Sequence, residues 1–251
     1  MNTIVQSIWG KEVMGKPFVP FTLPHLLGIL SIAFGLYTLI KNRHKLTNPI
    51  LRRKIEVGIA STLAAQQTTL YTWYTTSGNF SIAESLPLYS CRMAIIGSIY
   101  MILKRSYKAF EIIYFWGLVG AFIALITPDT SGFNFPHIML VQYFVGHGSL
   151  ILGIVYMMLA YNFKPTKDSL FRTYKITSIY FVLIYFVNKF VGGNYSYLNG
   201  KPHTPTLLDA LPPYPFYIPV ILISMFVLFF IAYMPFMMKR KENAAVLRVH
   251  S

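Results

Sequence analysis

The sequence predicts an all-α protein of seven transmembrane helices, with the N-terminus outside the cell and the C-terminus inside. Composition is the first indication, because 55% of the 251 residues are hydrophobic and only 12% are charged, unlike a soluble globular domain. Spacing is the second, because seven apolar stretches of roughly 20 residues alternate with short polar loops, and about that length of helix crosses a bilayer core. The third is charge, because nearly all Lys and Arg residues lie in every second loop.

The seven apolar stretches define the expected elements in chain order. Each is predicted to be a helix, because an open strand edge cannot exist in lipid. The expected helices cover Phe21–Ile40, Ile55–Thr76, Leu88–Leu103, Phe110–Ile126, His137–Tyr161, Tyr174–Val191 and Pro215–Met238. The third is short and begins just after Pro87, so we expect it to be tilted or partly re-entrant. The spans use most of the chain, so residues 1–251 are interpreted as a single seven-helix transmembrane domain.

Basic residues mark one side of the predicted membrane. They follow the first, third, fifth and seventh stretches: Lys41, Arg43, Lys45, Arg52, Arg53, Lys54, Lys104, Arg105, Lys108, Lys164, Lys167, Arg172, Lys175, Lys239, Arg240, Lys241 and Arg248. The other loops hold only Lys11, Lys16 and Lys201. Cytoplasmic loops retain Lys and Arg, so the basic loops are predicted to be cytoplasmic. The net charge of +14 is therefore interpreted as a topology signal, and no nucleic-acid partner is expected.

Other classes of site and segment are disfavoured. Residues 1–20 lack the order of a signal peptide, so no cleaved leader is expected. The single cysteine, Cys91, excludes an intrachain disulfide and a multi-cysteine zinc site. A metal site is a weak alternative, because its candidate ligands have no i, i+3 or i, i+4 spacing. These ligands are His25, His137 and His147 with Glu84 or Asp129. Neither a metal nor a cofactor is expected.

Cys91 and Arg92 form the first candidate site. A thiol is a nucleophile only as the thiolate, and an adjacent cation lowers its pKa, so Cys91 is a candidate catalytic residue. The alternative is that a lone membrane cysteine serves as a small apolar packing residue. Arg92 is expected either to hold a lipid phosphate by paired hydrogen bonds or to extend its charge to the headgroups.

His147 is the second candidate catalytic residue. It lies between Gly146 and Gly148, which allow another backbone or a substrate to come close. A histidine beside a nucleophile acts as a general base or acid, whereas the alternative is a buried neutral histidine with a hydrogen-bond partner. By its depth in the predicted helices, at ~1.5 Å per residue, His25 is an equally good partner for Cys91.

The remaining polar residues are assigned to substrate binding. Gln66 belongs to a polar stripe with Thr62, Thr69 and Trp73, which indicates either a cavity wall or hydrogen bonding between helices. Paired glycines and tyrosines after the sixth stretch predict either an anchoring loop or a lid over an outward-facing cavity. The predicted substrate-binding residues are Arg92, Gln66, Asn194, Tyr195, Lys201 and His25.

Short sequence runs follow one another in a specific order along nearly the whole chain. They are Leu86-Pro87-Leu88 with Cys91, Tyr114-Phe115-Trp116-Gly117-Leu118, Thr127-Pro128-Asp129, Phe135-Pro136-His137, His147-Gly148, Asn194-Tyr195-Ser196-Tyr197-Leu198, Lys201-Pro202, Leu207-Leu208-Asp209 and the run from Pro215 to Phe236. In order and spacing they resemble the bacterial YwaF family of integral membrane proteins. That family is similar to an animal transmembrane acyltransferase family that remodels ether phospholipids through a cysteine acyl-enzyme. More distantly, it resembles the androgen-induced membrane hydrolases, which use a Thr and a His.

The resemblance implies a nucleophile role for Cys91 and a base role for His147. It implies a membrane lipid acyltransferase or acyl hydrolase in the bacterial plasma membrane, with membrane lipids as partners. The sequence departs from the family pattern at Tyr89 and Arg92, where a His and an acid are expected.

Two further expectations concern substrate binding and the competing function. Arg92 or Lys201 is expected to hold the phosphate, and Gln66 or Asn194 to donate to the oxyanion. The alternative function is a non-enzymatic binder or transporter of a small amphiphile that uses the same cavity. The oligomeric state is left open.

Overall fold

The computed structural model describes residues 3–202 and 206–249. In these residues the regular structure is helical, and they contain no strand. The α-helices are α1 (Thr3–Trp9), α2 (Leu23–Lys41), α3 (Pro49–Thr76), α4 (Ser90–Lys104), α5 (Tyr107–Ile126), α6 (Ile138–Tyr161), α7 (Lys167–Val191) and α8 (Tyr217–Val249). Short 3-10 helices cover Arg43–Thr47, Tyr195–Tyr197 and Leu207–Ala210. The predicted all-α class is confirmed for this part of the chain.

Helices α2 to α8 lie where the seven apolar stretches predict helices, with differences at some ends. α7 begins at Lys167, well before the predicted start at Tyr174, because Thr166 and Ser169 form a reciprocal cap. The Thr166 hydroxyl accepts from the Ser169 N–H, and the Ser169 hydroxyl accepts from the Thr166 N–H. Apolar runs report the part of a helix that is in lipid, so they miss such polar first turns. The short helix α1 was not predicted.

The structure supports five candidate membrane spans. They are α2, α5, α6, α7 and the part of α8 from Tyr217 to Met238. α3 is long, but its first turns carry Arg52, Arg53, Lys54 and Glu56. α4 has 15 residues, which at 1.5 Å per residue span ~22 Å, less than the ~30 Å hydrocarbon core. The finer prediction of seven spans is therefore not confirmed.

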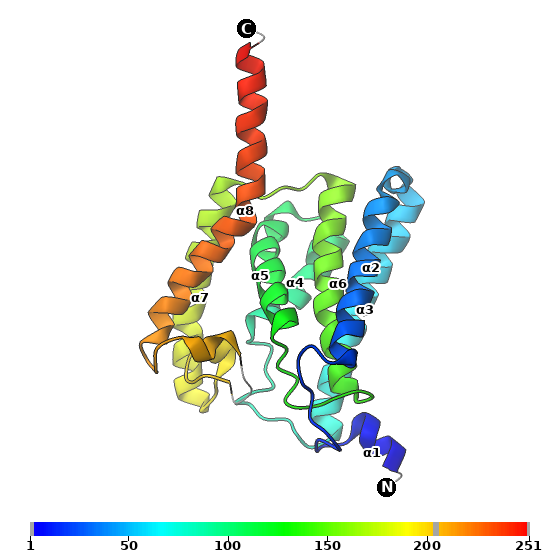
Figure 1. The fold of residues 1–251 in the computed structure, drawn as a ribbon, viewed down its shortest axis with the longest axis vertical. Coiled ribbons are helices and arrows are strands. Elements are labelled where there is room, and N and C mark those ends of the chain that lie inside the picture. The colour runs from blue at the N-terminus through cyan, green and yellow to red at the C-terminus, as the bar shows by residue number, and fades with distance from the viewer. Residues whose placement is uncertain (1–2, 203–205, 250–251) are drawn as a thin grey trace.

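The helices form one bundle (Figure 1). α3, α4, α5 and α6 pack most closely, α2 lies on α6, and α7 and α8 contact each other and α5. Glycines allow the close approach of α2 and α6. A Cβ atom at Gly28 would lie 2.5 Å from the Phe144 ring, and one at Gly148 would lie 2.7 Å from Ile32. Small residues at helix contacts are typical of membrane bundles.

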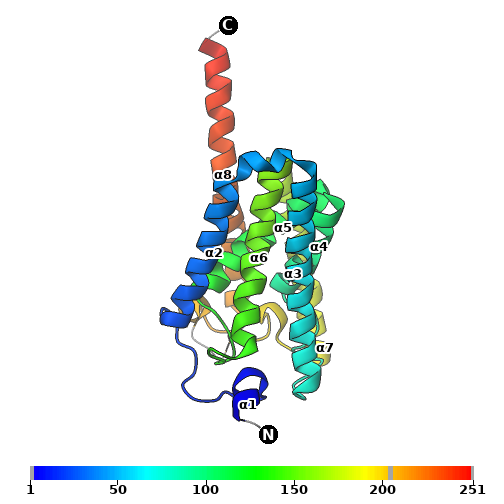
Figure 2. The same ribbon diagram turned by 90° about the vertical axis from the view of Figure 1, so that its right-hand side faces the viewer.

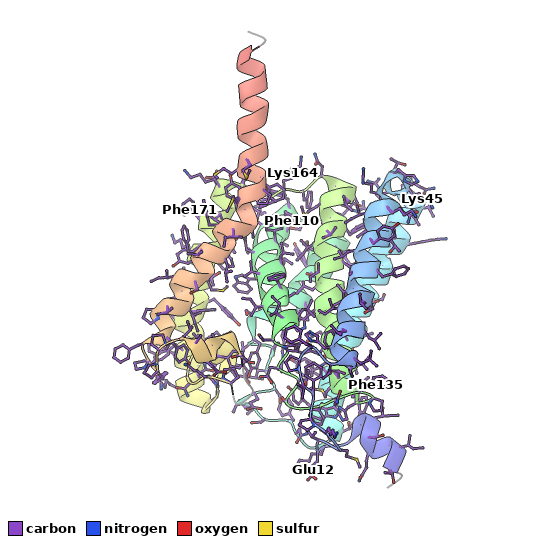
Figure 3. The ribbon with its side chains drawn as sticks, in the orientation of Figure 1. Glu12, Lys45, Phe110, Phe135, Lys164 and Phe171 are labelled. Carbon is purple, nitrogen blue, oxygen red and sulfur yellow. The ribbon has the colours of Figure 1, made fainter. Side chains whose placement is uncertain are left out.

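The two ends of the bundle differ in charge. The N-terminus lies at one end and the C-terminus at the other, and the last turns of α8 extend beyond the other helices (Figures 1 and 2). Lys45 and Lys164, from two basic loops, lie at the end of the bundle from which the last turns of α8 extend. Glu12 and Phe135 lie at the opposite end (Figure 3). We call these the basic end and the N-terminal end. The basic loops therefore gather at one end of the bundle, as the charge pattern requires.

Two buried carboxylates hold the helices together at the basic end. Glu56 of α3 is fully buried, and Arg105 at the end of α4 contacts both of its oxygens at 3.2 and 3.1 Å. Tyr156 and Tyr161 of α6 also donate to the Glu56 carboxylate. On the other side of the bundle, Arg172 of α7 lies 2.6 Å from Glu111 of α5. These polar contacts connect helices that are far apart in sequence.

Candidate functional site

Cys91 lies where four helices meet at the N-terminal end of the bundle. It is the second residue of α4 and is half-buried. Its sulfur faces α5, because a Cβ atom at Gly120 would lie 3.2 Å from Cys91 Sγ. The side chains of Tyr143 from α6 and Tyr180 from α7 are within electrostatic reach of this sulfur. The thiol therefore points into the bundle, toward α5 and two tyrosine side chains, rather than toward lipid.

The His147 ring packs against Tyr143, one helical turn earlier on α6. The two ring centroids are 4.4 Å apart, and His147 Nδ1 lies 2.9 Å from the Tyr143 carbonyl oxygen. A carbonyl oxygen only accepts hydrogen bonds, so Nδ1 carries the proton in this arrangement. The Nε2 atom of the neutral ring then keeps its lone pair. In the described residues this atom has no hydrogen-bond partner, so the ring has an unused basic nitrogen.

Tyr143 is the common neighbour of the two predicted catalytic residues. Its ring contacts His147, and its side chain lies within electrostatic reach of Cys91. Its hydroxyl donates to the Ala124 carbonyl at 2.9 Å, which fixes the phenol against the end of α5. No hydrogen bond joins the Cys91 thiol to the His147 ring in the described part of the chain. The structure thus places the His147 ring against Tyr143 and the Cys91 thiol within electrostatic reach of it, and a direct Cys91–His147 contact stays a prediction.

Asp129 and Tyr197 complete the polar neighbourhood of Tyr143. The Tyr197 hydroxyl donates to Asp129 Oδ2 at 2.9 Å, and the other carboxylate oxygen accepts from the Ser131 N–H at 3.1 Å. Burial and then the nearby Asp129 carboxylate raise the pKa of Tyr197 above its ordinary value, so this phenol stays protonated. The Asp129 carboxylate is within electrostatic reach of Tyr143, and Tyr143 is within electrostatic reach of Tyr197.

Sequence reasoning missed the tyrosines of this site. Tyr143, Tyr180 and Tyr197 are ordinary members of aromatic-rich membrane segments, and tyrosine is common at membrane interfaces for other reasons. Two runs in the sequence pointed to this site: Thr127-Pro128-Asp129, which contains the acid, and Asn194-Tyr195-Ser196-Tyr197-Leu198, which contains Tyr197.

Arg92 holds the segment that leads into α4. Its Nη1 atom donates to the carbonyl oxygens of Glu84, Ser85 and Leu86 at 2.9, 3.2 and 3.1 Å. Its Nη2 atom donates to the Tyr74 hydroxyl at 2.7 Å. The guanidinium also lies over the Tyr89 ring, 4.8 Å from the centroid. Arg92 therefore positions the start of α4. The four hydrogen bonds that its guanidinium donates go to protein groups rather than to a phosphate.

Gln66 belongs to a buried chain of side-chain amides. Gln67 donates to Gln66 at 2.9 Å, Gln66 donates to Gln142 of α6, and Gln142 donates to the Met139 carbonyl at 3.1 Å. The Oε1 atom of Gln67 is buried and has no hydrogen-bond partner. Of the two readings of the polar stripe, this arrangement favours hydrogen bonding between helices α3 and α6.

The loop between α7 and α8 folds back on the segment before α4. Tyr195 is fully buried, and its hydroxyl donates to the Ile82 carbonyl at 2.5 Å and accepts from the Leu86 N–H at 3.0 Å. Asn194 donates to the Gly200 carbonyl at 2.9 Å. Lys201 donates to the Leu211 carbonyl at 2.6 Å. The loop is thus anchored against the segment before α4, and its predicted binding residues contact the protein's own backbone.

Both ring nitrogens of His25 are hydrogen-bonded to backbone groups. The Phe21 N–H donates to Nδ1 at 2.8 Å, and Nε2 lies 2.7 Å from the Leu125 carbonyl oxygen. The ring is 2% exposed. With both nitrogens engaged, His25 fixes α2 to the end of α5. Of the two histidines that the sequence offered as a partner for Cys91, His147 is the one with a free nitrogen.

The described residues contain no group of three His, Cys, Asp or Glu side chains that could hold a metal ion.

Two surface hollows lie away from Cys91. One of about 680 Å³ runs along the start of α3, and one of about 270 Å³ lies on α7 between Ser178 and Leu183. Neither is lined by Cys91, His147, Gln66 or Asn194. The outward-opening pocket around those residues stays a prediction.

Together these features define a multi-pass helical membrane protein with a polar and aromatic cluster at one end of its bundle. The model of the TMEM164 family matches residues 18–233. Because this match covers most of the chain, the chain belongs to the TMEM164 family, a family of transmembrane proteins. No curated protein and no solved structure matches the chain. The expected membrane class is confirmed at this level, whereas the YwaF name and the acyltransferase resemblance stay predictions.

Proposed function

We propose that this protein is a membrane lipid acyltransferase or acyl hydrolase in which Cys91 is the nucleophile and His147 the proton carrier. The observation that supports it is the position of Tyr143, whose ring packs against a His147 imidazole with an unused Nε2 and whose side chain lies within electrostatic reach of the Cys91 thiol. The sequence resemblance independently assigns the same two residues to these roles. The family match supplies the membrane setting and no activity.

The proposed orientation has seven crossings, with α3 and α4 included. The N-terminus and the Cys91 cluster face outward, and the basic end faces the cytoplasm of a bacterial cell. The opposite positions of the two termini support this orientation (Figure 1). Tags at the two ends, tested with external protease on intact cells, are expected to give opposite results. Cleavage of both tags, or of neither, contradicts an odd number of crossings.

The proposed reaction has two steps that balance. First, the Cys91 sulfur attacks the carbonyl carbon of a lipid ester, a carbon–sulfur bond forms, and the ester carbon–oxygen bond breaks. The thiol proton passes to the His147 ring and then to the departing alcohol oxygen. Second, the hydroxyl of a lyso-lipid, or water, attacks the thioester while His147 accepts its proton, and the thiol is restored.

The developing oxyanion needs hydrogen-bond donors. The predicted donors Gln66 and Asn194 both donate to other protein groups. Tyr89, at the N-cap of α4, makes no side-chain capping hydrogen bond, so the first N–H groups of α4 have no side-chain acceptor from this residue. We therefore assign the oxyanion contact to the backbone N–H groups at the start of α4.

The experiment that tests the function measures acyl transfer from a fluorescent phospholipid by the protein in mixed lipid–detergent micelles. Wild type is expected to release lyso-lipid and to pass the acyl chain to added lyso-lipid or to water. Cys91→Ala is expected to abolish both, and Lys108→Gln at the distant basic end serves as a matched surface control. Equal turnover by Cys91→Ala and wild type contradicts the proposal.

The alternative is a binder or transporter of a small amphiphile. Two observations favour it: Arg92 and Lys201 are engaged with backbone carbonyls, and the thiol has no hydrogen bond to His147 among the described residues. Cys91→Ser separates the two functions. A binder is expected to keep its ligand affinity in this variant, whereas the acyl-enzyme loses its turnover because the hydroxyl is a far weaker nucleophile at neutral pH.

A further inference from the structure

A shallow and open surface hollow, which we call the groove, lies along the first three turns of α3 at the basic end of the bundle. Its lining residues all come from one face of α3. They are Pro49, Ile50, Arg53, Lys54, Val57 and Gly58, and each of them is exposed. The groove is at the end opposite Cys91, so it is not part of the site described above.

Two cations border this groove, and its lining residues include no carboxylate among the side chains that the structure describes. Lys54 has no hydrogen-bond or ion-pair partner in the described residues. The Arg53 side chain is 55% exposed, and its single ion pair, with Glu56, is long at 3.5 Å. The Glu56 side chain is 0% exposed and is held more closely by Arg105. The positive charge of Arg53 and Lys54 is thus largely uncompensated on the surface of α3.

The floor of the groove is apolar. Ile50 is 67% exposed and Val57 is 42% exposed. At Gly58 an added Cβ atom would meet nothing within 4 Å, so the glycine leaves open space next to the aliphatic side chains. The two cations therefore border a shallow surface whose exposed side chains are aliphatic, from Ile50 to Val57.

We propose that this groove binds one anionic phospholipid from the leaflet at the basic end. The headgroup phosphate lies between Arg53 and Lys54, where it accepts charge-assisted hydrogen bonds. One acyl chain lies along Val57 in the space left by Gly58. Charge complementarity selects an anionic lipid, because the basic surface of a membrane protein attracts acidic headgroups. The proposal is independent of the acyl chemistry at the other end.

Native mass spectrometry of the full-length protein, released from detergent with added lipid, tests the site. Phosphatidylglycerol and phosphatidylcholine with the same acyl chains are compared by titration. Wild type is expected to retain one phosphatidylglycerol with clear preference. Arg53→Gln with Lys54→Gln is expected to raise the Kd by ~10–30-fold, from the loss of two surface cations.

Two further variants keep the test sharp. Gly58→Leu keeps both charges but fills the hollow, so it is expected to weaken phosphatidylglycerol binding as well. Lys104→Gln with Lys108→Gln removes the same charge from exposed positions outside the groove, and is expected to leave binding unchanged. Circular dichroism with thermal unfolding confirms that each variant is folded.

Three results overturn the proposal. Equal loss of binding in the Lys104 and Lys108 control indicates general attraction to the basic surface and no site. Equal retention of phosphatidylcholine indicates that charge does not select the occupant. A dimeric species that retains no lipid, and that Gly58→Leu dissociates, indicates that a second copy of the chain occupies the groove.

Discussion

The His147 ring donates its Nδ1 proton to the Tyr143 carbonyl oxygen across 2.9 Å, four residues earlier on the same helix. This contact fixes the tautomer, because the acceptor has no proton to give. It also turns the ring onto the face of Tyr143, whose side chain is within electrostatic reach of Cys91. A local backbone contact of α6 thus determines which nitrogen is the base.

His147→Ala is expected to slow acylation of Cys91 by ~10²–10⁴-fold without abolishing it, because the ring carries a proton and is not the acyl acceptor. The rate of thioester formation from an activated acyl ester, followed by intact mass, measures the effect. His25→Ala is the matched control, since both of its ring nitrogens bond to backbone. It should lower the unfolding temperature and leave the acylation rate of the folded protein near that of wild type. The reverse pattern assigns the base to His25.

Gly120→Ala is expected to disturb the thiol directly. The new methyl group would lie 3.2 Å from Cys91 Sγ, so the sulfur or α5 must shift by a few tenths of an ångström. We expect a loss of ~1–2 kcal/mol in unfolding free energy and slower maleimide labelling of Cys91. Gly58→Ala is the control, because its Cβ meets nothing within 4 Å. Unchanged labelling in Gly120→Ala would show that the thiol faces away from α5.

Arg105→Ala is expected to destabilise the basic end strongly. It removes the closest cation from the fully buried Glu56 carboxylate. The buried negative charge is then stabilised only by two tyrosine hydroxyls and the longer Arg53 contact. The expected cost is ~3 kcal/mol in unfolding free energy, the lower part of the range for a broken buried pair because Arg105 is 49% exposed. Arg53→Ala should cost less than ~1 kcal/mol. Chemical unfolding in detergent gives both values, and similar losses would contradict the ranking.

Arg92→Lys tests whether Arg92 positions α4 or binds substrate. A lysine keeps the charge but not the fork that reaches three carbonyl oxygens and the Tyr74 hydroxyl. We therefore expect lower thermal stability and a lower kcat, with KM for an anionic phospholipid little changed. A raised KM with unaltered stability would instead place the phosphate on Arg92.

The helices could be predicted well because an apolar run in lipid must form a helix, since an open strand edge cannot exist there. The runs end near the helix ends at Thr76, Ile126 and Tyr161, where polar residues or a turn follow. The capped first turn of α7 could not be found in the same way, because polar residues there make hydrogen bonds that hydropathy does not encode. The number of crossings could not be fixed either, because α3 is polar at its start and α4 is short.

The roles of Cys91 and His147 stay predictions. Sequence singled out Cys91 as the only thiol, and the family resemblance favoured His147 over His25. The sequence could not give the partners of Arg92 or Tyr195, since most of these are backbone groups brought near by the folding of loops. Nor could it single out Tyr143, whose importance depends on the packing of α6 against α4 and α5.

The central claim is that Cys91 carries the acyl group. Intact mass spectrometry of the protein, incubated with a short-chain phospholipid and quenched in acid, tests it most directly. Wild type is expected to gain the mass of one acyl chain, to lose it in neutral hydroxylamine, and to show the adduct on the Cys91 peptide, while Cys91→Ala gains nothing. An adduct that survives hydroxylamine, or that forms equally on Cys91→Ala, contradicts the account.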